Sequence, residues 1–155
     1  MAHPLVRPRP QEGSDASAMT TDVFTPKKRS AVMRRVKGRD TAPEMTVRRA
    51  LRALGVGYRL GGAGLPGRPD VVMKGRRAVI FVHGCFWHGH DCARGAREPK
   101  ANADYWRAKI GRNRERDRVS EQALIADGWR VATLWECDLK NPAALNVRLR
   151  SFLGL

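Results

Sequence analysis

The pattern of hydrophobic and polar positions first indicates a helix near residue 50. Val47, Leu51 and Leu54 repeat at the spacing of one helix face. Residues 41–44 carry a capping-box pattern with proline in the first turn, and Gly55 is a typical C-terminal stop. This stretch therefore predicts an amphipathic helix with defined ends.

Short apolar runs predict strands. Residues 70–73 and 78–82 are rich in β-branched side chains and are separated by Lys-Gly-Arg-Arg, as in a hairpin of buried strands. The remaining expected elements are a basic helix at 27–37, a short strand at 56–60, a long basic helix at 103–126, a strand at 130–135 and a helix from 141 to about 152. This order implies an α/β fold whose mixed central sheet is flanked by helices on both faces.

The composition limits the class of protein. The chain has 155 residues, and residues 1–25, with several prolines and small polar side chains, predict a disordered leader before a single domain at 26–155. Thirty Lys and Arg against 15 Asp and Glu give a formal net charge of +15. Because neutralised phosphates supply most nonspecific affinity for nucleic acid, we expect a polyanionic partner.

The sequence predicts neither a membrane span nor an export signal. A run of about twenty apolar residues is absent, and the N-terminus has no apolar stretch after its first charges. The three cysteines are an odd number, which favours reduced thiols and metal binding over disulfides. We therefore expect an intracellular protein without a membrane partner.

Residues 83–92, His-Gly-Cys-Phe-Trp-His-Gly-His-Asp-Cys, concentrate the reactive side chains, with three of the four histidines. Thiolate and imidazole ligands in a closed set of four are typical of structural zinc. The ligands that the spacing suggests are Cys85, His90, Cys92 and Cys137. On spacing alone, His88 is an alternative ligand to His90. If His90 binds the metal, His88 is free to act as a general base near neutral pH.

Asp70 begins one strand of the predicted hairpin and His83 ends the other. Because a hairpin brings the start of its first strand near the end of its second, we expect these two side chains to lie close together. A carboxylate at a strand end is a natural Mg²⁺ ligand, and the metal can activate water and polarise a phosphodiester. The alternatives are a turn role for Asp70 after Pro69 and a simple capping role for Glu44.

The helix at 103–126 is a candidate surface for nucleic acid. Its basic residues, Lys109 and Arg112 among them, fit either a phosphate-facing surface or a merely solvated face. Asn113 on the same helix is a candidate for contact with base edges.

Aromatic residues divide into two groups. Phe86 and Trp87 form an adjacent pair on a very basic protein, which indicates contact with nucleic acid. Trp129 and Trp135 lie on or beside the strand at 130–135, where core packing is expected.

Four longer motifs resemble the very short patch repair (Vsr) endonucleases. They are Leu65-Pro-Gly-Arg-Pro-Asp70, Val79-Ile-Phe-Val-His-Gly-Cys-Phe-Trp-His88, Trp106-x-x-Lys109-Ile-Gly-Arg-Asn113-x-Glu-Arg-Asp117, and Gly128-Trp-Arg-Val131 through Trp135-Glu-Cys137. The resemblance covers about residues 27 to 153. It implies a restriction-endonuclease-like fold in which histidines replace part of the usual Pro-Asp…Asp/Glu-x-Lys site. It also implies nicking of double-stranded DNA 5′ of the thymine in a T·G mismatch, which arises by deamination of 5-methylcytosine.

The resemblance further implies roles for individual residues. The metal ligands would be Asp70 and the main-chain carbonyl of Val82 for catalytic Mg²⁺, and Cys85, His90, Cys92 and Cys137 for structural Zn²⁺. The catalytic group would comprise Asp70, His88 as general base, His83 supporting the phosphate or the water, and Glu44 beside the site. An aromatic wedge beside the mismatch would comprise Phe86, Trp87 and Trp106.

The sequence departs from the family pattern at three positions. Val82 stands where threonine is frequent, and Gly89 and Asp91 stand within what is sometimes a longer histidine run. Only the main-chain carbonyl of Val82 is an expected ligand, so the ligand set is unaffected.

The expected partners are a DNA duplex with a T·G mismatch and, functionally, a cytosine-5 DNA methyltransferase. Because a nick needs only one active site, we expect a monomer, and the resemblance implies a location on the nucleoid in the bacterial cytoplasm. Two alternatives share the charge and the aromatic residues: a restriction-type endonuclease that cuts intact duplex, and a non-catalytic zinc-stabilised DNA-binding module. The module would not need Asp70, His83 and His88 together.

Overall fold

The computed structural model describes residues 38–62 and 64–155. Its elements, in chain order, are helix α2 (Ala42–Ala53), strand β1 (Val71–Met73), 3₁₀ helix η1 (Lys74–Arg76), strand β2 (Ala78–His83), helix α3 (Ala103–Ala126), strand β3 (Arg130–Trp135), 3₁₀ helix η2 (Glu136–Lys140) and helix α4 (Pro142–Leu153). The leader expected at 1–25 and the helix expected at 27–37 lie outside the described residues. Within those residues, no helix has the length and apolarity to cross a membrane.

The three strands form one mixed sheet in the order β1-β2-β3. β1 runs antiparallel to β2, and β3 runs parallel to β2 with Trp135 opposite His83. The predicted hairpin and the predicted strand at 130–135 are confirmed. The strand expected at 56–60 is wrong, because Arg59 makes only an isolated bridge to Val72 and Gly61, at a φ of 66°, then turns the chain away.

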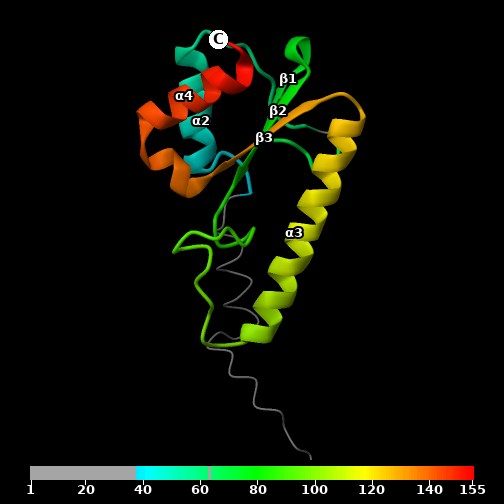
Figure 1. Cartoon of the computed structure of the whole chain (residues 1–155), viewed down its shortest axis with the longest axis vertical. Helices are drawn as coiled ribbons and strands as arrows, with labels where there is room; N and C mark the ends of the chain where they lie inside the picture. The colour runs from blue at the N-terminus through cyan, green and yellow to red at the C-terminus, as the bar shows by residue number, and fades with distance from the viewer. Residues whose placement is uncertain (1–37, 63) are drawn as a thin grey trace, which may run out of the picture.

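Helices cover both faces of the sheet, as expected from the order of the elements (Figure 1). α2 and α4 pack on one face, where Leu51 and Leu149 meet Ile80 of β2. α3 covers the other face, where Leu124 packs with Val79 of β2. Neighbouring residues of β2 thus point to opposite apolar layers, which is the period-two pattern of a strand buried on both faces.

The start of α2 shows only half of the predicted capping box. Thr41 is the N-cap, and its Oγ1 accepts a hydrogen bond from the Glu44 amide at 3.4 Å. The Glu44 carboxylate does not return to Thr41, because its Oε2 accepts from the Asp40 amide and from the Arg48 guanidinium. Capping alone therefore does not explain Glu44.

The long helix α3 extends well beyond the sheet (Figure 1). Residues 84–102 connect the end of β2 to the first residue of α3. Gly89 lies against Ile110 and Arg114 of α3, where a Cβ on the glycine would stand only 2.6 Å from the Ile110 Cγ2. The segment rich in histidine and cysteine is therefore held between the end of the sheet and α3.

Candidate active site and metal site

One cavity of about 550 Å³, at the end of β2, collects polar side chains from separate elements. They include Glu44 from α2, Asp70 before β1, His83 at the end of β2, His88 after it and Asp117 from α3. The structure therefore brings together all the catalytic candidates named from the sequence. It adds Asp117, to which the sequence reasoning assigned no role.

Asp70 is held at the edge of the sheet by the backbone of β2. Its Oδ2 accepts a hydrogen bond from the Val82 amide at 2.7 Å. In a strand the N–H and C=O of one residue face the same edge, so the Val82 carbonyl faces the Asp70 side as well. Burial raises the pKa of Asp70 to about 6, against the lowering effect of the Val82 hydrogen bond, and the Glu44 charge raises it further.

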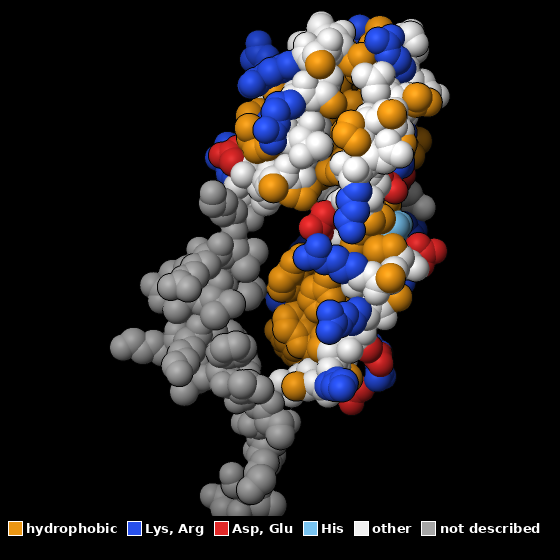
Figure 2. All heavy atoms as spheres, turned by 90° about the vertical axis from the view of Figure 1, so that its left-hand side faces the viewer, with side chains coloured by type: hydrophobic (Ala, Val, Ile, Leu, Met, Phe, Trp, Pro, Cys, Tyr) orange, Lys and Arg blue, Asp and Glu red, His pale blue; other side chains and the backbone are white. Residues whose placement is uncertain are grey.

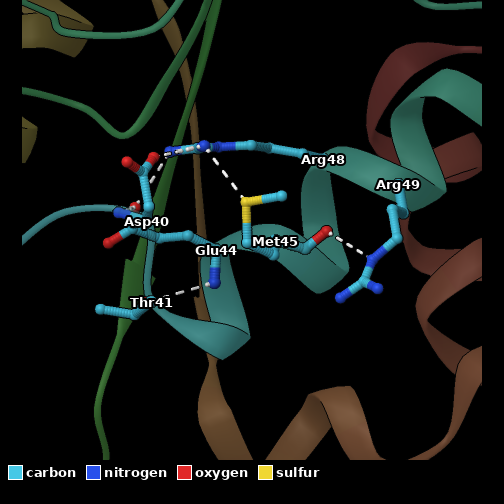
Figure 3. A network of polar contacts seen from close by, with 6 residues as sticks. All are labelled: Asp40, Thr41, Glu44, Met45, Arg48 and Arg49. Atoms are coloured by element: carbon cyan, nitrogen blue, oxygen red, sulfur yellow. Dashed lines mark hydrogen bonds and ion pairs between the residues drawn. The ribbon is translucent and has the colours of Figure 1, made fainter. Parts of the chain in front are cut away.

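Glu44 is fixed by a buried network at the start of α2 (Figure 3). Glu44 and Arg48 are each only 7% exposed, and an Arg48 guanidinium nitrogen lies 3.1 Å from Glu44 Oε2. The Asp40 amide donates to the same oxygen at 3.0 Å, and Arg48 also pairs with the Asp40 carboxylate at 2.6 Å. These contacts hold one Glu44 oxygen and leave Oε1 without a hydrogen bond to any described residue.

His83, His88 and Asp117 line the same cavity and contact one another. The two imidazoles are stacked with their centroids 3.7 Å apart and their planes within 4°. His88 Nδ1 lies 2.5 Å from Asp117 Oδ2. Because an ionised carboxylate can only accept, Nδ1 is the donor in this pair, and in the neutral ring Nε2 then keeps its lone pair. Burial, together with the neighbouring His88, lowers the pKa of His83 to about 4, so this ring is neutral at physiological pH.

The same three side chains offer two imidazoles and a carboxylate whose ligand atoms all lie within 4.8 Å of one another. A metal binds an imidazole nitrogen close to the plane of the ring. Because the two rings are parallel and 3.7 Å apart, an ion shared between them would lie well outside both planes. This arrangement therefore suits proton transfer better than shared chelation.

A second cluster lies behind the cavity and has the donor set of a metal site. Its members are Cys85, His90, Cys92 and Cys137, whose ligand atoms lie within 4.8 Å of one another. Cys137 Sγ is 3.5 Å from His90 Nδ1. Bond lengths of about 2.3 Å to sulfur and 2.0 Å to nitrogen, at a tetrahedral angle, place two such ligands about 3.5 Å apart. The spacing thus fits one tetrahedrally bound ion, and the structure selects His90 over His88 as the histidine of the cluster.

The thiols of this cluster differ in acidity. A hydrogen bond from the Gly95 amide, with a smaller contribution from His90, lowers the pKa of Cys92 to about 6. Burial, and then the neighbouring Cys85 and Cys92, raises the pKa of Cys137 to about 12. A cation among these side chains would favour the thiolate forms that bind metal.

Trp135 contacts both the cavity and the cluster of cysteines and His90. The sequence predicted only core packing for this residue. Its ring stacks on His90 with centroids 4.3 Å apart and lies edge-on to His83 at 5.3 Å. It is only half-buried, whereas Trp129 is 9% exposed and lies in the core as expected. The strand β3 therefore aligns the metal cluster with the catalytic cavity.

Aromatic side chains form a compact group between residues 84–102 and α3. The centroid of Trp106 is 5.7 Å from that of Trp87 and 5.6 Å from that of Phe86. Lys109 places its ammonium 5.6 Å and 5.4 Å from the centroids of the two indoles. Figure 2 shows a continuous hydrophobic area in the lower half of the described chain, bordered by Lys and Arg side chains. The three residues expected to act as a wedge are therefore assembled in one place.

Two of the expected DNA contacts are already engaged within the protein. Asn113 Nδ2 donates to the Trp87 carbonyl at 2.9 Å, and its Oδ1 accepts from Arg116 at 3.0 Å. Lys109 packs against the indoles, whereas Arg112 is exposed on α3. In this structure, Asn113 and Lys109 therefore hold the aromatic group rather than reaching out for bases or phosphates.

Three residues with clear structural roles were not found from the sequence: Arg48, Asp117 and Trp135. Asp117 closes the α3 motif that supported the family resemblance, which was the only available signal for it. Its contact with His88 depends on how α3 is rotated against β2, and hydrophobic spacing does not define that rotation.

Carboxylates and histidines share one cavity at the end of a mixed sheet, beside clustered aromatic rings and a basic helix, and these are the features expected of a DNA endonuclease. Residues 21–94 match the family model for DNA mismatch endonuclease Vsr. The chain is 49% identical over 133 residues to the type II nicking enzyme V.XorIIP of Xanthomonas oryzae pv. oryzae, covering 86% of this chain and 97% of that protein. It is 44% identical over 119 residues to the DNA mismatch endonuclease Vsr of Escherichia coli, covering 77% and 76%.

A third relative is the type II nicking enzyme V.NmeAIP of Neisseria meningitidis, 44% identical over 129 residues, which cover 83% of this chain and 91% of the relative. The chain therefore belongs to the Vsr family of DNA mismatch endonucleases. The predicted resemblance is confirmed, and with it an endonuclease activity on DNA.

Proposed function

We propose that this endonuclease nicks duplex DNA on the 5′ side of the thymine in a T·G mismatch, in a Mg²⁺-dependent step that starts very short patch repair. The observation that carries the proposal is the 2.5 Å pair of His88 and Asp117, which faces the same cavity as Asp70 and Glu44. An oriented base and two carboxylates at one site are the groups that metal-assisted phosphodiester hydrolysis needs.

Each residue has a distinct part in the proposed reaction. Asp70 and the Val82 carbonyl would hold Mg²⁺, which, when bound, supplies positive charge against the scissile phosphate. His88 Nε2 takes a proton from the attacking water while Asp117 stabilises the resulting imidazolium through Nδ1. The neutral His83 ring, stacked on His88, hydrogen-bonds the phosphate or the water. Arg48 keeps the Glu44 carboxylate turned toward the cavity.

The aromatic group supports the choice of a mismatch as substrate. Apolar side chains that enter a base step must unstack it, and a mismatched pair lowers that energetic cost. Phe86, Trp87 and Trp106 are already packed against one another, so little ordering is needed before they enter the stack. Their neighbour His88 would then approach the backbone next to the unstacked pair.

The remaining parts of the proposal concern the surroundings of the reaction. Cys85, His90, Cys92 and Cys137 would hold a structural Zn²⁺ that fixes the segment carrying His88. T·G pairs that arise from 5-methylcytosine imply a functional link to a cytosine-5 DNA methyltransferase. One active site suffices for one nick, so we propose a monomer acting on the bacterial nucleoid in the cytoplasm.

The test is strand-specific cleavage of matched duplexes that differ only by T·G or T·A, in several sequence contexts, with and without Mg²⁺. We expect a Mg²⁺-dependent nick 5′ of the mismatched thymine, lost in Asp70→Ala and reduced about 10²- to 10⁴-fold in His88→Ala. Asp127→Ala, on an aspartate remote from the cavity, is the control and should cut like the wild type. Equal cutting of T·A would identify a restriction-type enzyme, and binding without cutting in every context would identify a DNA-binding module.

A further inference from the structure

Arg68 has a backbone conformation that arginine rarely adopts. Its φ is 50°, in the left-handed region, and the residue after it is Pro69. A side chain with a Cβ disfavours the left-handed region, because the Cβ comes too close to the following carbonyl oxygen. A following proline in turn favours extended conformations for the residue before it. Glycine or asparagine would fit this position with less strain.

The surrounding loop imposes this conformation. The Arg68 amide donates to the Leu65 carbonyl at 3.2 Å, which closes a turn with Pro66 and Gly67 at its centre. A Cβ on Gly67 would stand 2.7 Å from the Ser120 Cβ, so the turn is pressed against α3. Pro69 is fully buried on the other side. With both neighbours fixed by packing, Arg68 cannot relax.

The other residues with positive φ show what is unusual about Arg68. Apart from glycines, the described residues with positive φ are Asp40, Arg68, Arg77 and Asn102. Aspartate and asparagine tolerate this region. Arg77 lies at the end of η1, and its guanidinium is engaged by the protein itself. It donates to the Asp127 carbonyl and lies over the Trp129 ring, 5.1 Å from the ring centroid. The Arg68 guanidinium has no hydrogen bond, ion pair or ring contact with any described residue.

Arg68 is instead exposed at the wall of the catalytic cavity, which it lines together with Asp70 and His88. Two other arginines line the same cavity, and both are engaged: Arg94 pairs with Glu136 at 3.0 Å, and Arg116 donates to Asn113 at 3.0 Å. Arg68 is therefore the cationic side chain of this wall, among the described residues, that remains available to a ligand.

We propose that Arg68 binds a phosphate of the DNA backbone at the mouth of the cavity and so positions the scissile strand. This rests on the proposed function, because it takes DNA as the ligand of the cavity. A guanidinium matches the geometry of phosphate oxygens and stays charged at every working pH. The strained conformation then has a physical reason, because a residue that fitted the backbone better would lack the charge.

Salt dependence of binding distinguishes this role from a structural one. We would measure the affinity of wild type, Arg68→Gly and Arg68→Asn for T·G and T·A duplexes, without added Mg²⁺, over a range of salt concentrations. Loss of one phosphate contact should weaken binding to both duplexes alike and reduce the slope of log affinity against log salt by about one. The nicking rate on T·G should fall roughly 10- to 100-fold.

The same substitutions of Arg68 should not lower the stability of the folded protein. Glycine and asparagine accept the left-handed conformation, so the unfolding midpoint of either variant should equal or exceed that of the wild type. Arg77→Gly is the matched control, because it also removes one positive charge at a positive φ. It should lower stability through its lost contacts and leave the salt slope unchanged.

The outcomes are distinct. A wild-type salt slope in Arg68→Gly, or the same loss of slope in Arg77→Gly, would overturn the phosphate contact. A drop in stability together with a wild-type slope would assign Arg68 a structural role. If the wild type binds DNA but nicks neither duplex, the proposed function fails, and the slope still decides the role of Arg68.

Discussion

The metal cluster and the catalytic cavity share the segment 83–92 but satisfy their polar groups in different ways. The four ligand atoms of the cluster face one another within 4.8 Å, and a single ion would saturate them. The cavity instead holds two of its carboxylates by one oxygen each: Asp70 through the Val82 amide, and Glu44 through Arg48 and the Asp40 amide. Their second oxygens make no hydrogen bond to a described residue. One ion alone would therefore complete the cluster, whereas the cavity leaves carboxylate oxygens open to a ligand.

One segment thus combines stability with reactivity, because its residues divide between the two groups. Cys85 and His90 face the cluster, whereas His83 and His88 face the cavity. Trp135 packs against histidines of both groups. The rigidity of the first group therefore fixes the position of the second.

Removing a ligand of the cluster is expected to have the largest effect. Cys137→Ala should abolish metal binding, measured as zinc per chain, and lower the free energy of unfolding by on the order of 5 kcal/mol or more, because binding energy in such sites is folding energy. Nicking should be lost with it. Arg94→Ala, which removes an exposed ion pair to Glu136, is the control and should change stability by less than about 1 kcal/mol. A fully active, zinc-free Cys137→Ala protein would show that the cavity does not depend on the cluster.

A smaller effect is expected when the cavity loses the orientation of its base. Asp117→Asn preserves size but can present an amide N–H to His88 Nδ1, which favours the tautomer whose Nε2 is protonated. In a comparable carboxylate–histidine arrangement this costs about 10⁴-fold in rate, so we expect single-turnover nicking to fall by roughly 10²- to 10⁴-fold. Zinc content and DNA affinity should stay at wild-type values. If the rate is unchanged, Asp117 does not orient His88 during the reaction.

The smallest effect is expected for Asp70→Asn in the absence of Mg²⁺, and it is a gain in the free energy of unfolding rather than a loss. The pKa of Asp70 is raised from 3.8 to about 6, chiefly by burial, so its ionisation opposes folding. The stability that the protonated form provides is present below pH 3.8 and is lost as the pH rises through about 6. Asp70→Asn keeps an acceptor for the Val82 amide and carries no charge. At pH 8 it should be more stable than the wild type by on the order of 1–3 kcal/mol.

Urea denaturation at pH 4 and pH 8 measures this difference. The gain from Asp70→Asn should nearly vanish at the lower pH, where wild-type Asp70 is protonated. Added Mg²⁺ should stabilise the wild type and leave Asp70→Asn unchanged, because only the carboxylate is expected to bind the ion. A less stable Asp70→Asn protein at pH 8 without metal would contradict the burial argument.

Local sequence predicted those parts of the site that lie on one continuous segment. The spacing of Cys85, His90 and Cys92 indicated the cluster, and the hairpin placed Asp70 near His83. Both follow from short-range geometry, since a tight loop and two paired strands leave few alternatives. The two apolar layers around β2 followed in the same way from the alternation of its residues.

Contacts between elements were not predictable in the same manner. Asp117, Asn113 and Arg48 sit on helices, and their partners depend on how each helix is rotated about its axis when it packs. A one-residue change in that rotation, about 100°, would direct Asn113 outward as expected instead of toward the Trp87 carbonyl. The long basic helix α3 has apolar residues too thinly spread to define its buried face, so the sequence could not indicate the rotation.

The order of residues 85–90 limits how this family can change. The proposed metal ligand Cys85, two aromatic rings, the proposed base His88, a glycine and the proposed ligand His90 follow one another without a spacer. An inserted or deleted residue anywhere between Cys85 and His90 would break the ligand spacing and misplace His88 in a single event. Drift in this stretch is therefore restricted to substitutions, and length variation between relatives should gather in other loops. Engineering a new preference for flanking bases should begin there as well.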